Sequence, residues 1–170
     1  MPGRGLFLAI DDFTLKQLRA TKGDALRRDF IHELEEVIDS KYVQETDKAW
    51  EFIFVALYTG KTTCGIEHPD LVSMSKIFRG AKSLHRGDSY ILNWLAKSEF
   101  PEIVAKFEQL HQSGLRELYD TCNQGWFHAG VYKGTDEQFE YISRWYDRIV
   151  QFLARMRAEN RHILFTSDYN

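Results

Sequence analysis

The segment Leu6-Phe7-Leu8-Ala9-Ile10 is a short apolar run that ends abruptly at Asp11-Asp12. It is too short for a membrane span or for the apolar core of a signal peptide, so it predicts a β-strand near residues 5–10. Two later segments, 90–95 and 162–167, are also apolar and aromatic, and they predict two further strands. Strands at both ends of the chain, with helices between them, indicate a small sheet packed by helices.

Helices are predicted where apolar residues recur at steps of three and four positions. About six are expected, over residues 12–19, 24–39, 46–59, 69–79, 99–113 and 135–160, with a shorter helical piece near 115–119. Asp24 has the side chain of an N-cap for the second of these helices. The inward face of that helix is predicted to consist of Leu26, Phe30, Leu34, Val37 and Ile38. Segment 46–59 begins at Thr46-Asp47 and is apolar nearly all round, so we expect Trp50 to be buried at the centre of the domain.

The composition indicates one soluble domain over residues 1–170. The chain is 44% hydrophobic and 28% charged, with a formal net charge of -3. We therefore expect an α+β fold, with a small and mostly antiparallel sheet that helices cover on one side. A mildly acidic chain lacks the field of a general nucleic-acid binder, and no apolar stretch is long enough to span a membrane. The two cysteines, Cys64 and Cys122, are too few for a disulfide framework, which favours a cytoplasmic location.

The signatures of catalytic and metal sites are incomplete. Residues 59–63, Thr-Gly-Lys-Thr-Thr, end like a phosphate-binding P-loop, but Val55 stands where that motif needs a glycine. Two Cys–His pairs suggest zinc ligands, yet the chain has no C-x-x-C. These pairs are Cys64 with His68 and Cys122 with His128. H-E-x-x-H and G-x-S-x-G are absent as well, so we predict no catalytic residue, metal or cofactor, although a Cys nucleophile with a distant His stays open.

Acidic side chains are concentrated between Asp24 and Glu51. This segment holds nine acidic and four basic residues, a net charge of -5. The ordinary interpretation is a solvated helix face. The alternative is a docking surface for a basic protein, because complementary charge raises association rates. The candidate partner-binding residues here are Glu33, Glu35, Glu36 and Asp39.

Two predicted loops, 80–89 and 123–134, supply the other candidates. The second is rich in glycine and in aromatic residues, which are costly in a loop unless they are packed or used for contact. The candidates are His85, Arg86, Trp126, Phe127, His128 and Tyr132. All six are candidates for a protein-binding surface. One alternative is that the aromatic rings of segment 123–134 pack as core under the last helix. The other is that the candidates except Phe127 line the pocket of a small-molecule enzyme or sensor.

Taken in order, several short motifs resemble those of the YfbM-like family, small bacterial proteins grouped as a domain of unknown function. The matching residues are the run 5–11, Asp47-Lys48-Ala49-Trp50, Thr59-Gly60, Pro69 with Leu71, Phe78-Arg79-Gly80 and Gly130-Val131-Tyr132. The resemblance implies a compact α+β fold and carries over no catalytic residue. We therefore expect a non-enzymatic protein-binding domain, one concrete form of which is an immunity protein that neutralises a toxin by direct binding.

Overall fold

The computed structural model describes residues 2–59, 68–79, 82–85, 90–121 and 134–169. Its elements, in chain order, are β1 (Pro2–Ile10), α1 (Asp12–Ala20), α2 (Asp24–Val37), the 3-10 helix η1 (Ser40–Tyr42), β2 (Val43–Asp47), α3 (Ala49–Thr59), α4 (His68–Arg79), β3 (Lys82–Ser83), β4 (Tyr90–Leu95), α5 (Phe100–Ser113), α6 (Leu115–Thr121), α7 (Asp136–Ala158) and β5 (His162–Tyr169). The α+β class is confirmed, and the three predicted strands are present as β1, β4 and β5.

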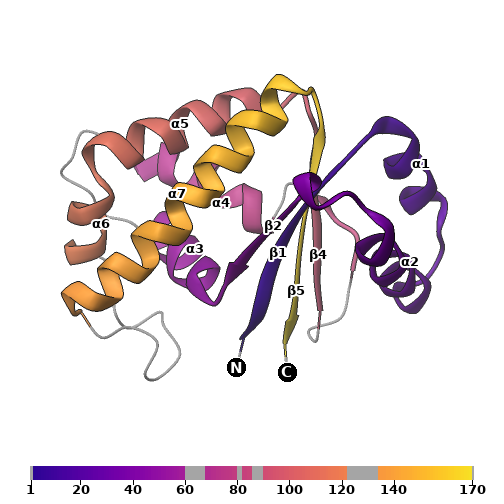
Figure 1. Ribbon diagram of the computed structural model, residues 1–170, viewed down its shortest axis with the longest axis horizontal. Helices are drawn as coiled ribbons and strands as arrows, with labels where there is room; N and C mark the ends of the chain where they lie inside the picture. Colours follow the sequence, from indigo (N-terminus) through magenta and orange to yellow (C-terminus); the bar gives the residue numbers. More distant parts are fainter. Residues whose placement is uncertain (1, 60–67, 80–81, 86–89, 122–133, 170) are drawn as a thin grey trace.

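The strands form one antiparallel sheet in the order β2-β1-β5-β4-β3. The first and last strands of the chain pair at its centre, with Ile10 opposite His162 and Leu8 opposite Leu164. Both chain ends consequently lie at the same end of the sheet (Figure 1). The start of α1, which follows β1, is therefore brought next to the start of β5.

Helices cover both faces of this sheet, so the prediction that they pack on one side is wrong. Helices α3 to α7 lie on one face, and α1 and α2 lie on the other (Figure 1). Alternate residues of β5 point into the two layers: Phe165 joins the larger core, and Leu164 joins the smaller one. The sequence feature that indicates two covered faces is the apolar run 7–10, in which every residue is buried. An uninterrupted apolar strand is typical of a sheet covered on both faces.

The larger core is built around aromatic rings from the sheet and from α3 and α4. The ring centroid of Phe165 lies 5.0 Å from that of Phe7, 5.3 Å from that of Phe78 and 5.2 Å from that of Trp50. Trp50 is 1% exposed, and its indole N–H donates to the carbonyl of Gly3 at 3.1 Å. Its predicted burial is confirmed.

The predicted helix start at Thr46-Asp47 is wrong, because these two residues end β2 and α3 begins at Ala49. The Thr46 hydroxyl donates to the Gly5 carbonyl at 2.9 Å, and β2 pairs with the outer edge of β1. The backbone N–H and C=O groups on the outer edge of β1 need hydrogen-bond partners. Segment 43–47 supplies them by forming an edge strand.

Two of the predicted helix starts are confirmed in detail. The Asp11 carboxylate accepts the backbone N–H of Thr14 at 2.8 Å at the start of α1, and the Thr135 hydroxyl accepts that of Gln138 at 3.2 Å at the start of α7. Asp24 does not cap α2, however. The N-cap is Gly23, whose φ of 97° is a conformation that glycine adopts without strain.

Candidate functional site

Helix α2 turns most of its surface to solvent. Ile31 is its one buried residue, and it packs in the smaller core. Leu26 and Val37, which were expected to face inward, are 59% and 80% exposed. With about 100° of rotation per residue, both lie roughly 120–140° away from Ile31 around the helix axis. The predicted inward face is therefore wrong at Leu26 and Val37, whereas Phe30, Leu34 and Ile38 pack against the smaller core as expected.

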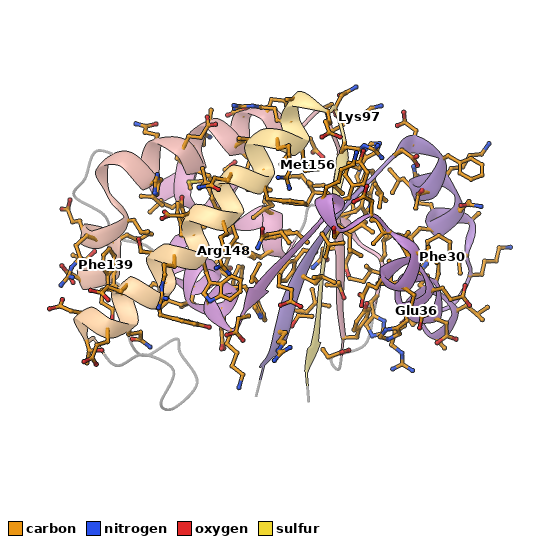
Figure 2. The ribbon with its side chains drawn as sticks, viewed as in Figure 1. Phe30, Glu36, Lys97, Phe139, Arg148 and Met156 are labelled. Carbon is orange, nitrogen blue, oxygen red and sulfur yellow. The ribbon has the colours of Figure 1, made fainter. Side chains whose placement is uncertain are left out.

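Three carboxylates lie between Leu26 and Val37 on the same side of α2. They are Asp29, Glu33 and Glu36, all of which are exposed. From Leu26, steps of three and four residues lead through Asp29 and Glu33 to either Glu36 or Val37, and such steps align side chains along one side of a helix. We call these five residues the outer face of α2; Figure 2 labels Glu36 on this helix. Two of the four predicted acidic candidates, Glu33 and Glu36, belong to this face.

The other two acidic candidates lie elsewhere. Glu35 stands on the flank of α2, where burial raises the pKa of its carboxyl group. Asp39 lies beyond the helix, and its carboxylate accepts the backbone N–H of Lys41 at 3.0 Å at the start of η1. The sequence therefore identified an acidic helix, but only Glu33 and Glu36 of the four candidates share its outer face.

His85 points into the molecule, between α2 and the sheet. Its side chain is 9% exposed, and its Nδ1 atom lies 3.9 Å from an Asp24 carboxylate oxygen. Its ring stands at 84° to that of Tyr90, with 5.5 Å between the centroids, and burial raises the pKa of Tyr90 to about 12. Neither ring nitrogen of His85 has a hydrogen-bond partner in the described part of the chain. His85 is thus separate from the outer face of α2.

The remaining candidates lie outside the described residues: Arg86, Trp126, Phe127, His128 and Tyr132. The predicted pocket between segments 80–89 and 123–134 lies largely outside them too, and so do Cys64 and Cys122. Among the residues that the structure does describe, no group of three His, Cys, Asp or Glu side chains has the geometry of a metal site. No described helix is long and apolar enough to cross a membrane.

The structure contains a groove that the sequence did not reveal. It lies between α1 and β4, has a volume of about 470 Å³, and is lined by Asp12, Leu15, Lys16, Arg19, Ala20, Trp94, Ala96 and His162. The guanidinium carbon of Arg19 lies 5.6 Å from the centre of the Trp94 ring. The Nζ atom of Lys82, on the neighbouring strand, lies 4.7 Å from it. Two cations therefore gather on one indole at this site.

A hydrogen-bonded triad closes one end of the groove. His162 Nε2 lies 2.8 Å from one carboxylate oxygen of Asp12, and Lys97 Nζ donates to the other at 2.6 Å. The backbone N–H of Lys97 donates to His162 Nδ1 at 3.1 Å. Because Nδ1 accepts this bond, the proton of the ring is on Nε2 and is donated to Asp12. Both ring nitrogens are occupied, so His162 does not act as a general base in this arrangement.

These bonds hold Asp12 in its charged form. The hydrogen bond from Lys97 lowers the pKa of the Asp12 carboxyl group, and the bond to His162 lowers it further. Lys97 is labelled in Figure 2, near the end of the sheet where α1 departs. The triad connects α1, the segment after β4 and the first residue of β5. Its observed role is to hold three elements together at the groove.

A second hollow, of about 490 Å³, lies between α6 and α7 and includes Arg116, Asp120, Phe139 and His111 in its lining. Its cations are already matched within the chain. Arg116 donates to Asp120 at 3.0 Å and to Asp136 at 2.8 Å, and these carboxylates raise the pKa of its guanidinium group. His111 is paired with Asp147. This hollow therefore offers less uncompensated charge to a ligand than the groove beside Trp94.

Comparisons with known proteins identify the family. A family model described as "Domain of unknown function (DUF1877)" matches residues 1–166. The chain belongs to this family. Among solved structures, the DUF1877 chain is similar to YfbM from Escherichia coli, titled a protein of unknown function. The TM-score is 0.61 at 19% identity, and the match covers 98% of this chain and 99% of YfbM. At that identity the likeness shows a shared fold. No curated protein matches the chain.

Proposed function

We propose that this DUF1877 protein is a protein-binding domain that docks through the outer face of α2. The observation that carries the proposal is the pairing of two large exposed apolar side chains, Leu26 and Val37, with three exposed carboxylates on one helix face. The carboxylates alone would keep this face solvated, and Leu26 and Val37, at 59% and 80% exposure, add apolar surface beside them that a binding partner would cover. Binding sites on proteins combine such apolar contacts with polar groups.

The chemistry of this face favours a basic partner. Asp29, Glu33 and Glu36 would meet Lys or Arg side chains, and Leu26 and Val37 would meet apolar residues beside them. Charge complementarity accelerates encounter, and apolar burial slows dissociation. A toxin neutralised by an immunity protein is one concrete partner of this kind, since a basic nuclease surface has the complementary charge. A small-molecule pocket at segments 80–89 and 123–134 is the alternative, and the inward-pointing His85 is its described part.

The first experiment is site-specific photocrosslinking in the native host. A benzoyl-phenylalanine side chain replaces Glu33 on α2 in one variant and Glu140, which is exposed on α7, in a control variant. We expect one abundant crosslinked protein from position 33, with a basic surface, and none from position 140. An identical set of crosslinks from both positions would contradict docking through α2.

The second experiment measures affinity for the crosslinked protein by titration calorimetry. We expect Glu33→Lys combined with Glu36→Lys to weaken binding by roughly tenfold or more, because two attractive pairs become repulsive. The matched control is Glu137→Lys combined with Glu140→Lys, two exposed acids on α7. The control should bind as the native chain does. Equal affinities for the native chain and the α2 double variant would refute the proposal.

A further inference from the structure

Arg19 and Lys82, the two cations beside Trp94, have no acidic partner among the residues that the structure describes. No Asp or Glu oxygen lies within ion-pair distance of Arg19 or Lys82, and the same holds for Lys16 on the groove wall, within the residues that the structure describes. By contrast, Arg116 on α6 has two carboxylates in contact. Two like charges beside one ring repel each other, and a bound anion would offset that repulsion.

Asp12, the one acid among the described residues that line the groove, does not compete for these cations. Both oxygens of Asp12 are occupied, one by His162 Nε2 and the other by Lys97 Nζ, so its charge is offset locally. The positive field of Lys16, Arg19 and Lys82 is therefore available to a ligand. Their side chains are exposed, whereas Trp94 beneath them is buried and holds its position in the smaller core.

The rest of the lining suits an organic molecule rather than a bare ion. Leu15, Ala20 and Ala96 give the groove apolar walls, and its volume of about 470 Å³ lies within the range of small-molecule sites. An arginine fork binds phosphate oxygens in pairs, and lysines add point charges. We propose that the groove between α1 and β4 binds an organic phosphate of mononucleotide size, with Arg19 of the lining on the phosphate and with Lys82, which lies beside Trp94 outside the lining, adding a second positive charge. This site is independent of the outer face of α2.

The test is an NMR titration of the full-length, nitrogen-15-labelled chain. The indole N–H signal of Trp94 is assigned by its loss in Trp94→Phe, and it is followed while AMP is added at low ionic strength. We expect a saturable shift of this signal with AMP and none with adenosine, which lacks the charge. The double variant Arg19→Gln with Lys82→Gln should weaken AMP binding by roughly tenfold or more, because it removes the two positive charges beside Trp94.

Arg148→Gln is the matched control, since Arg148 lies 4.8 Å from the centre of the Trp145 ring on α7 and so has the same cation–ring chemistry elsewhere. It should leave AMP binding unchanged. The variants change exposed residues, and an unaltered circular dichroism spectrum checks that they fold. The absence of a saturable AMP shift would overturn the proposal. So would equal affinity for AMP in the double variant, binding of inorganic phosphate as tight as that of AMP, or tighter binding of a hexaglutamate peptide.

Discussion

At the scale of single residues, Asp12 shows how one side chain serves both the fold and the groove. It is the first residue of α1, yet its partners, Lys97 and His162, come from the segment after β4 and from the start of β5, which are distant in the sequence and meet α1 at the same end of the sheet. These contacts depend on the antiparallel pairing of β1 with β5. They are invisible in the sequence, where Asp12 and His162 are separated by most of the chain. Proximity in the fold, rather than a local motif, creates this site.

The lowered pKa of Asp12 predicts a pH dependence of stability. A carboxyl group whose pKa is lower in the folded state contributes stability above its unfolded pKa, and this contribution is lost as the pH falls through the folded value. We expect Asp12→Asn to lower the urea midpoint at pH 7. The difference from the native chain should shrink as the pH falls from about 5 to about 2.5, because Asp12 then becomes neutral in both states. Urea titrations across this range measure it, and a difference independent of pH would contradict the argument.

At the scale of elements, the N-cap of α7 shows how one local side chain contributes to the stability of a long helix. The Thr135 hydroxyl accepts the N–H of Gln138 at the start of α7, and α7 supplies Tyr146, Ile149 and Phe152 to the larger core. We expect Thr135→Ala to lower the free energy of unfolding by about 1 kcal/mol, within a range of about 0.5–2 kcal/mol. Thr135→Ser keeps the hydroxyl and should stay near the native value in chemical denaturation. Equal losses in both variants would show that the hydroxyl is not the cause.

The elements that the sequence predicted well are those with strong periodicity. The helix from Thr135 and the strand from Leu6 are examples, since each has a long apolar pattern and a clear polar boundary. β2 was missed because Gln44, Glu45 and Asp47 are typical of a polar loop, and only the open edge of β1 extends them. β3 has two residues, too few for any pattern. In α2, apolar spacing alone placed Val37 inward, although this helix rests on the sheet mainly through Ile31.

The candidate site was predicted only in part, for a related reason. The acids of α2 form a dense local cluster, so Glu33 and Glu36 were found. The groove is assembled from α1, from β4 with the segment after it, and from the start of β5, and nothing within any one of these segments signals it. Trp94 alone is a typical core residue of a strand, and Arg19 alone is a typical cation at the end of a helix. Their meeting follows from the strand order, which one sequence does not specify.

At the scale of the whole molecule, one sheet joins two cores that share no helix among the elements the structure describes. β1 and β5 supply alternate side chains to both, so damage to one core should weaken the sheet that supports the other. Leu164 and Ile163 are both buried neighbours on β5, and they point into opposite cores. We expect Leu164→Ala and Ile163→Ala each to lower the free energy of unfolding by about 2–5 kcal/mol.

We further expect each variant to unfold in one transition, with the same midpoint by far-ultraviolet circular dichroism and by tryptophan fluorescence. The reason is that both helix layers pack against β5. Once β5 leaves the sheet, neither α1 and α2 on one face nor α7 on the other can stay packed. If the layer of α1 and α2 were an independent unit, Leu164→Ala would instead give an early partial transition while Ile163→Ala would not. Coincident midpoints in both variants would show that the outer face of α2 and the groove beside Trp94 rest on one cooperative structure, so ligand binding at either would stabilise the whole chain.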